Sequence, residues 1–262
     1  MIRLIATDID ATLMVPGTTV PEGNRAALRK AAERGVRIAL ATVRTRITAA
    51  RIVEEIGVAC DLVCQGGAVV YDAEGRLLHE VVIPLDLARD IAAFGDEHGL
   101  GLLTTLDGHH NWGPGYVSGL PGVPKPREHF ATNLATVTRA PTRFMVTGER
   151  GVNLLRERFG GSGLHIVRHL RADGSIIDAA ITLAGGTKAE GLAALCRGLG
   201  IGLAEVLALG DAESDVGMIR EAGVGVAVAN APPEVRAAAD WVAPAAGECG
   251  VAAAVERFIL RG

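Results

Sequence analysis

Three short, largely apolar runs in this chain each end in a polar side chain, and this pattern constrains the fold more than any other feature. The runs are residues 2–7, 36–41 and 206–210, followed by Asp8, Thr42 and Asp211. Such runs, separated by helical segments, are typical of parallel strands that are buried on both faces of a sheet. Residues 24–34 and 46–56 have the spacing and composition of crossover helices. The sequence therefore predicts an α/β fold with a doubly wound parallel sheet.

The polar residues that follow these runs are expected to meet. In doubly wound sheets, ligands bind beyond the carboxyl ends of the strands. Asp8, Thr42 and Asp211 would all lie at that edge. The sequence thus predicts one polar site to which three separate strands contribute.

The middle of the chain has a different pattern. Its expected elements are a helix at 85–98, strands at 100–105, 109–112 and 143–147, a helix at 152–159, and strands at 165–170 and 175–183, with turns at Asp107-Gly108 and Asp173-Gly174. This order is typical of an α+β domain inserted into a parallel core. We predict a core formed by residues 1–82 and 185–262 and an inserted cap at 83–184. Roles for His109, His110 and Trp112 in substrate binding stay open, with cap surface or packing as the simpler interpretation.

Composition narrows the classes of partner. The 262 residues, 49% of them hydrophobic, are enough for a sizeable core plus an insertion. A net charge of −4 gives no reason to expect a nucleic acid or an anionic membrane as partner. No apolar run reaches the roughly 18 to 20 residues that a membrane span needs, and no secretory signal is visible. Four scattered cysteines indicate reduced thiols, so we expect a cytoplasmic protein.

Two carboxylates follow the first run. An ionised Asp8 can attack phosphorus directly, and Asp10 would lie where it can protonate a leaving oxygen. Mg²⁺ prefers oxygen ligands and takes one or two protein carboxylates, which Asp8 and Asp211 would supply. By itself, however, an Asp-x-Asp pair is common and favours the simpler interpretation of a turn after a strand.

Lys188 favours the chemical interpretation. Residues 187–190 match a capping box, which places Lys188 in the first helical turn, where a cation opposes the helix dipole. The chain has three lysines among its 26 basic residues, so a lysine here suggests a specific need. An ammonium that bridges Asp8 and a phosphate is one such need, and an exposed lysine without a partner is the alternative. Asp211 and Asp215, four residues apart, can share one metal shell, although acidic residues at a helix start would also explain Asp215.

These motifs together resemble a known family. Asp8-x-Asp10-x-Thr12-Leu13, Thr42, Lys188 and Gly210-Asp211-x-x-x-Asp215 have the order and spacing of the four motifs of the haloacid dehalogenase superfamily. The inserted middle and the segments 222–226 and 230–235 resemble its Cof-type branch, which has a type IIB α/β cap. The resemblance implies a Rossmann-like core with an inserted cap and a Mg²⁺-dependent phosphatase, because dehalogenases of the superfamily lack the second aspartate.

The resemblance also implies roles for individual residues. Asp8 would be the nucleophile and Asp10 the general acid and base, while Thr42 and Lys188 would hold the phosphoryl group. Mg²⁺ would be bound by the Asp8 carboxylate, the Asp10 backbone carbonyl and Asp211, with Asp215 ligating or supporting it. The expected substrate contacts are Thr12, Arg44, Gly66 and Asn230.

Five positions depart from the family pattern. Ala11 replaces a usual glycine, so we expect a negative φ there. The others are Val43, Gly66, Ser214 and Ala229. These departures leave the rate and the substrate undetermined, but they do not change the predicted reaction.

The sequence therefore predicts a phosphoric monoester hydrolase that acts on a small phosphorylated metabolite, such as a sugar phosphate. A phosphomutase with the same core is one alternative, and a catalytically weakened metabolite-binding protein is another. The oligomeric state stays open.

Overall fold

The chain forms two compact units in the computed structural model. The structure describes residues 1–106, 108–117, 129–171 and 174–261. One unit comprises Met1–Glu80 and Thr187–Gly262, and the other comprises Val81–Gly186. The expected turns at Asp107-Gly108 and Asp173-Gly174 each include a residue outside the described ones.

The described part of the first unit contains an eight-stranded sheet in the order β13-β12-β11-β1-β2-β3-β4-β5. The parallel strands are β1 (Leu4–Thr7), β2 (Arg37–Ala41), β3 (Cys60–Cys64), β11 (Val206–Gly210), β12 (Val224–Val228) and β13 (Trp241–Ala243). The three strands expected from the apolar runs are confirmed. An antiparallel extension, β4 (Val69–Tyr71) and β5 (Leu77–Glu80), adds to this sheet and was not expected.

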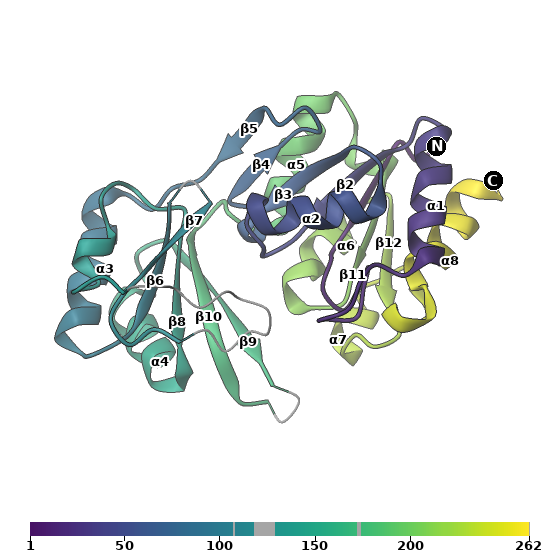
Figure 1. The fold of residues 1–262 in the computed structure, drawn as a ribbon. Coiled ribbons are helices and arrows are strands. Elements are labelled where there is room, and N and C mark those ends of the chain that lie inside the picture. Colours follow the sequence, from purple (N-terminus) through teal and green to yellow (C-terminus); the bar gives the residue numbers. More distant parts are fainter. Residues whose placement is uncertain (107, 118–128, 172–173, 262) are drawn as a thin grey trace. The chain divides into compact units, whose positions relative to one another are not determined.

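Helices cover both faces of this sheet (Figure 1). α1 (Glu22–Glu33), α2 (Arg46–Ile56) and α8 (Gly250–Val255) pack on the face to which Ile5 of β1 points. α5 (Lys188–Leu199) and α6 (Val216–Glu221) pack on the opposite face, with Leu4 and Ala6. The short α7 (Pro233–Arg236) packs against β12. The doubly wound α/β fold is confirmed.

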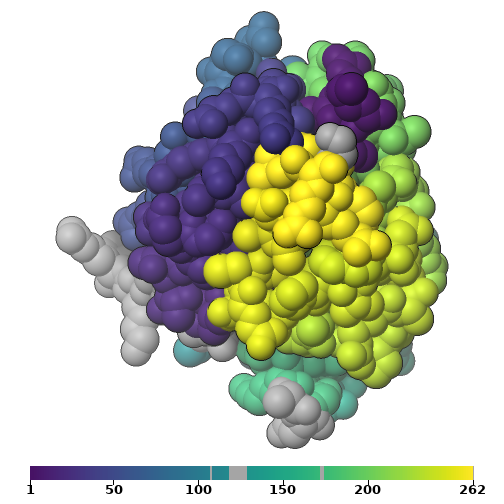
Figure 2. Space-filling model, turned by 90° about the vertical axis from the view of Figure 1, so that its right-hand side faces the viewer, coloured from purple at the N-terminus to yellow at the C-terminus, as the bar shows by residue number. Residues whose placement is uncertain are grey.

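The two ends of the chain meet on one face of this unit, where the N-terminal α1 lies beside the C-terminal α8 (Figure 2). Asn24 in α1 links the two segments. Its Nδ2 donates to the carbonyl of Leu13, and its Oδ1 accepts from the backbone N–H of Ala252. The start of α1 is thereby tied both to the loop after β1 and to α8.

The second unit has its own sheet and core. Its described strands pair antiparallel in the order β7-β6-β8-β10-β9, namely β6 (Leu102–Leu106), β7 (His109–Trp112), β8 (Arg143–Thr147), β9 (Leu164–Leu170) and β10 (Ile176–Leu183). α3 (Leu85–Glu97) and α4 (Gly148–Phe159) pack on one face of this sheet. The expected α+β pattern is confirmed, although α4 begins at Gly148 rather than at Val152.

The three cap residues of open role lie on β7. Trp112 is buried against Tyr116, with ring centroids 5.1 Å apart, which is a packing role. His110 Nδ1 lies 3.2 Å from Thr105 Oγ1, and burial, aided by Arg143, lowers the pKa of His110 to about 4.

No described helix has the length and apolar character needed to cross a bilayer.

Candidate active site

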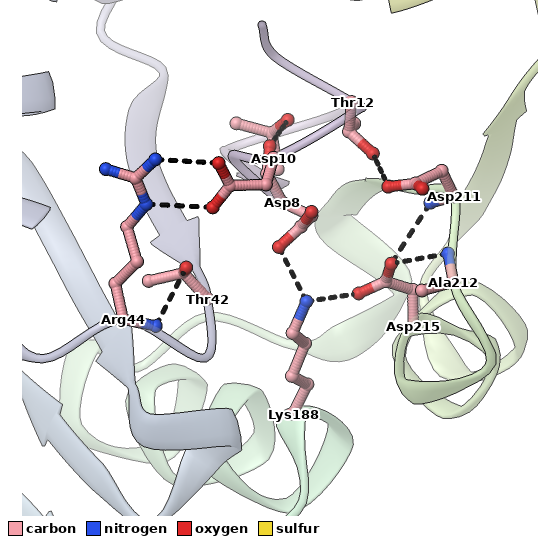
Figure 3. A network of polar contacts seen from close by, with 10 residues as sticks. Asp8, Asp10, Thr12, Thr42, Arg44, Lys188, Asp211, Ala212 and Asp215 are labelled. Atoms are coloured by element: carbon pink, nitrogen blue, oxygen red, sulfur yellow. Dashed lines mark hydrogen bonds and ion pairs between the residues drawn. The ribbon is translucent and has the colours of Figure 1, made fainter. Parts of the chain in front are cut away.

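The site lies at the carboxyl ends of three neighbouring strands. β1 lies between β2 and β11 in the sheet, so the residues that follow these strands are adjacent in space. Asp8 follows β1, Thr42 follows β2, and Asp211 follows β11. The structure thus brings together the polar residues that end the three apolar runs (Figure 3).

Lys188 is the centre of a buried ion network. It is the first residue of α5, directly after Thr187, which forms a capping box with Glu190. Its Nζ donates to Asp8 Oδ1 and to Asp215 Oδ1, both at 2.6 Å. The three side chains are only 2%, 8% and 0% exposed, respectively. Buried charges of this kind are stable only when they are paired, so both carboxylates depend on Lys188 and the ammonium depends on them.

Asp215 also shapes the loop after β11. Its Oδ2 accepts from the backbone N–H groups of Asp211 and Ala212, both at 3.0 Å. A side chain at Gly210 would bring its Cβ within 2.3 Å of Asp215 Cβ, so the glycine is required by this close approach. Asp215 therefore fixes the position of Asp211.

Thr12 holds the side chain of Asp211. Its hydroxyl donates to Asp211 Oδ1 at 2.7 Å. Thr12 itself is fully buried. The Asp211 carboxylate is therefore oriented by a neutral donor from the loop after β1, while its backbone is held by Asp215.

The donor set fits a divalent cation. Carboxylate oxygens of Asp8, Asp211 and Asp215 lie within 4.8 Å of one another. These three carboxylates face one ammonium, which leaves an excess of two negative charges. Hard oxygen donors with this charge suit Mg²⁺.

Burial, with a smaller contribution from the neighbouring carboxylates, raises the carboxyl pKa values of the site. Burial raises the pKa of Asp8 well above its ordinary value despite the opposing charge of Lys188, and the other two carboxylates add to the rise. Burial likewise raises the pKa of Asp211 to about 6, against the hydrogen bond from Thr12. Burial opposes the charged form of Lys188, but Asp215 and Asp8 outweigh it and raise its pKa. A bound cation would favour the ionised carboxylates.

Arg44, which was expected to contact substrate, binds Asp10 in this structure (Figure 3). Its Nε donates to Asp10 Oδ2 at 2.8 Å and its Nη2 to Oδ1 at 2.7 Å. The backbone N–H of Arg44 donates to Thr42 Oγ1 at 3.1 Å. No described residue accepts the hydroxyl hydrogen of Thr42, which can therefore donate to a ligand.

The prediction for Ala11 is wrong, because its φ is +61°. The loop is held in this left-handed conformation by two hydrogen bonds, from Ala11 N to Met14 O and from Asn230 Nδ2 to Ala11 O, both at 2.8 Å. The conformation costs about 1 to 2 kcal/mol for a residue with a Cβ, and alanine has the smallest such side chain. Asn230 Oδ1 in turn accepts from Ala246 N at 2.9 Å, so both ends of the amide that was expected to contact substrate are bound to backbone.

Sequence reasoning missed Gly67. Gly66, with φ of +75°, donates its N–H to Thr42 O at 2.9 Å, which places it beside the site. The neighbouring Gly67 has a φ of +111°, and a Cβ there would lie 1.9 Å from Thr187 O. This loop therefore packs against the residue that precedes Lys188. The Gly66-Gly67 pair was the available signal, because consecutive glycines indicate a tight turn.

Comparisons with known proteins agree with this geometry. The family model for haloacid dehalogenase-like hydrolases matches residues 5–112 and 153–255. The chain is 26% identical to 5-amino-6-(5-phospho-D-ribitylamino)uracil phosphatase YcsE of Bacillus subtilis, over 99% of this chain and 96% of that protein. It is 27% identical to HMP-PP phosphatase of Serratia proteamaculans, over 90% and 87% of the two chains. The solved structure of the subclass IIB sugar phosphatase BT4131 superposes with a TM-score of 0.81 at 21% identity and 98% coverage of both chains, which shows a shared fold.

These findings confirm the predicted family, its Cof-type branch and the enzyme class, a phosphoric monoester hydrolase. The two matched segments include the strands that precede Asp8, Thr42 and Asp211. The chain belongs to the haloacid dehalogenase-like hydrolase family.

Proposed function

We propose that this protein is a Mg²⁺-dependent phosphatase that hydrolyses a small phosphorylated metabolite through a phospho-aspartate at Asp8. The observation that carries the proposal is the buried network in which Lys188 pairs with Asp8 and Asp215 beside Asp211. Lys188 binds Oδ1 of Asp8, and we assign the attack on phosphorus to the other oxygen, Oδ2. The same ammonium lies close enough to Asp8 to hold a phosphoryl oxygen.

The reaction has two steps. In the first, Asp8 Oδ2 forms a bond to phosphorus while the bond to the leaving oxygen breaks, and Asp10 gives that oxygen a proton. In the second, the ionised Asp10 takes a proton from water, which attacks the phosphorus of the phospho-aspartate. The P–O bond to Asp8 then breaks and inorganic phosphate leaves. Thr42 donates its hydroxyl hydrogen to the phosphoryl group throughout.

The residues that would hold Mg²⁺ are the Asp8 and Asp211 carboxylates and the backbone carbonyl of Asp10. When bound, the cation supplies positive charge to the phosphoryl oxygens. Asp215 acts as a support, because its Oδ1 is bound to Lys188 and its Oδ2 to two backbone N–H groups. Thr12 orients the carboxylate of Asp211 through its hydroxyl group. We propose this role for Thr12 in place of the substrate contact expected from the sequence.

The substrate class follows from the relatives, whose names specify a phosphorylated ribitylaminouracil and HMP-PP. Both are small phosphorylated compounds, and a sugar phosphate is our specific proposal for this chain. We also propose a cytoplasmic location.

Release of inorganic phosphate from a panel of phosphorylated metabolites and from p-nitrophenyl phosphate, with and without Mg²⁺, tests the proposal. The Asp8→Asn variant is the control. We expect Mg²⁺-dependent turnover by the native protein and none by the variant. Equal rates for the two proteins would favour a non-catalytic binding protein, and turnover that requires a bisphosphate activator would favour a phosphomutase.

A further inference from the structure

The contact between Arg44 and Asp10 differs from the other ion pairs of the site. It joins two half-exposed side chains, with 27% of Arg44 and 35% of Asp10 accessible. Both carboxylate oxygens are nevertheless bound, at 2.7 and 2.8 Å, by two nitrogens of one guanidinium. A bidentate pair of this kind fixes the plane of the carboxylate as well as its position.

The backbone of Arg44 is held by two hydrogen bonds. The N–H of Arg44 donates to Thr42 Oγ1 at 3.1 Å, and its carbonyl accepts from Gln65 N at 2.9 Å. The loops after β2 and β3 therefore hold Arg44 on both sides of its Cα. Asp10 belongs to a third segment, the loop after β1, so the pair links all three loops.

We propose that Arg44 is a positioning residue that orients Asp10 for proton transfer, rather than a ligand of the substrate phosphate. The inference rests on the proposed function and specifies a part of it. Each Asp10 oxygen keeps a second lone pair while it is bound to Arg44, so either oxygen can still exchange a proton with a leaving group or with water. Without the bidentate contact, the half-exposed Asp10 side chain rotates, and misplacement of a catalytic group by about 1 Å can lower a rate about a hundredfold.

Substrates with different leaving groups separate the two roles. An alkoxide must be protonated as it leaves, whereas p-nitrophenolate leaves readily as an anion. In single turnovers of Arg44→Gln we expect the rate of phospho-aspartate formation from the best sugar phosphate of the panel to fall by a factor of about 10 to 100, and from p-nitrophenyl phosphate by less than about threefold, because only this first step depends on the leaving group. The substrate concentration that half-saturates this first step should change by less than about twofold for both substrates, because the substrate contacts are intact.

Three further variants complete the design. Arg44→Lys keeps the charge but not the two-pronged geometry, so it should lose most of the same activity. In an Asp10→Asn background, Arg44→Gln should cause no additional loss, because the two residues act as a unit. Arg46→Gln is the matched control, since Arg46 lies two residues further along and stacks on Tyr71, with its Cζ 4.7 Å from the ring centroid.

Several outcomes would overturn the inference. Equal losses of the phosphorylation rate on both substrates, additivity with Asp10→Asn, or weaker substrate binding with an unchanged phosphorylation rate would each show that Arg44 acts on the phosphate or on the fold instead. In each case the native protein still turns over and the proposed function stands. A native protein no more active than Asp8→Asn would overturn the proposed function, and the role of Arg44 together with it.

Discussion

The two sides of the site hold their charges in different ways. On one side Lys188 binds Asp8 and Asp215, and the three side chains are 0 to 8% exposed. On the other side Arg44 binds Asp10, and the two side chains are 27% and 35% exposed. The hydrogen bonds have similar lengths, 2.6 Å on the buried side and 2.7 to 2.8 Å on the open side.

Burial changes what the same kind of contact does. Removing one partner of a buried ion pair leaves an uncompensated charge and costs about 3 to 5 kcal/mol, whereas an exposed pair contributes about 0 to 1 kcal/mol. We therefore expect the buried side to determine whether the site folds, and the open side to determine how accurately the carboxyl group of Asp10 is oriented for proton transfer.

The largest effect is expected for Lys188→Met, which keeps a side chain of similar volume and removes the charge. Asp8 and Asp215 would then be buried without a counter-charge, so the free energy of unfolding should fall by about 3 to 5 kcal/mol. Phosphatase activity should be lost as well. Urea denaturation measures the stability, with the exposed Lys30 of α1 changed to Met as the matched control, for which a change within about 0.5 kcal/mol is expected. If Lys188→Met were as stable as the control, the buried ion network would contribute no more to stability than an exposed charge, which would contradict the proposed difference between the two sides of the site.

The next effect concerns pH. Asp8 and Asp211 have folded-state pKa values above the ordinary 3.8, and that of Asp211 is about 6, so the folded protein binds these protons more tightly than the unfolded chain. Their contribution to stability is present below pH 4 and is lost as the pH rises through about 6 for Asp211. Without metal, Asp211→Asn should therefore gain in thermal unfolding midpoint relative to the native protein between pH 4 and pH 7. Mg²⁺ at pH 7 should raise the midpoint of the native protein more than that of the variant, and parallel profiles would contradict the assignment of the shift to Asp211.

A smaller effect is expected for Thr12→Val, which removes the donor to Asp211 Oδ1 without changing the shape of the side chain. Loss of a residue that orients a metal ligand lowers affinity by about 10- to 100-fold, so the Mg²⁺ concentration for half-maximal activity should rise by at least about tenfold. Thr12→Ser keeps the hydroxyl and should stay close to the native value. If Thr12→Val instead raised KM for the phosphorylated substrate alone, Thr12 would be a substrate contact, as first expected.

The smallest effect is expected at the backbone of the open side. Ala11→Gly relieves the positive φ and should raise the free energy of unfolding by about 1 kcal/mol. Ala32→Gly, in the helix α1, is the matched control and should lower it by about 0.5 to 1 kcal/mol. Opposite signs for the same substitution would show that the gain comes from backbone conformation. A loss of stability in Ala11→Gly would mean that the left-handed conformation is not strained.

The sequence alone determined much of the fold and the location of the site. Three apolar runs identified β1, β2 and β11, because strands buried on both faces need apolar side chains throughout. The position of the polar residues after those runs identified the sheet edge, because parallel strands end on the same side. The capping box identified the start of α5, because its signal spans only residues 187–190. These features are local, so they can be recognised in a linear pattern.

Only the tertiary structure decided which polar groups bind one another. Arg44 and Asp10 are 34 residues apart, and Asn230 and Ala11 are 219 apart, so no local spacing relates either pair. The positive φ of Ala11 is disfavoured for alanine by itself, and the hydrogen bonds with Asn230 and Met14 hold it. The sequence therefore determined which residues come to the edge of the sheet, and folding decided their partners, because hydrogen-bond partners depend on distances between segments that only the packed chain defines.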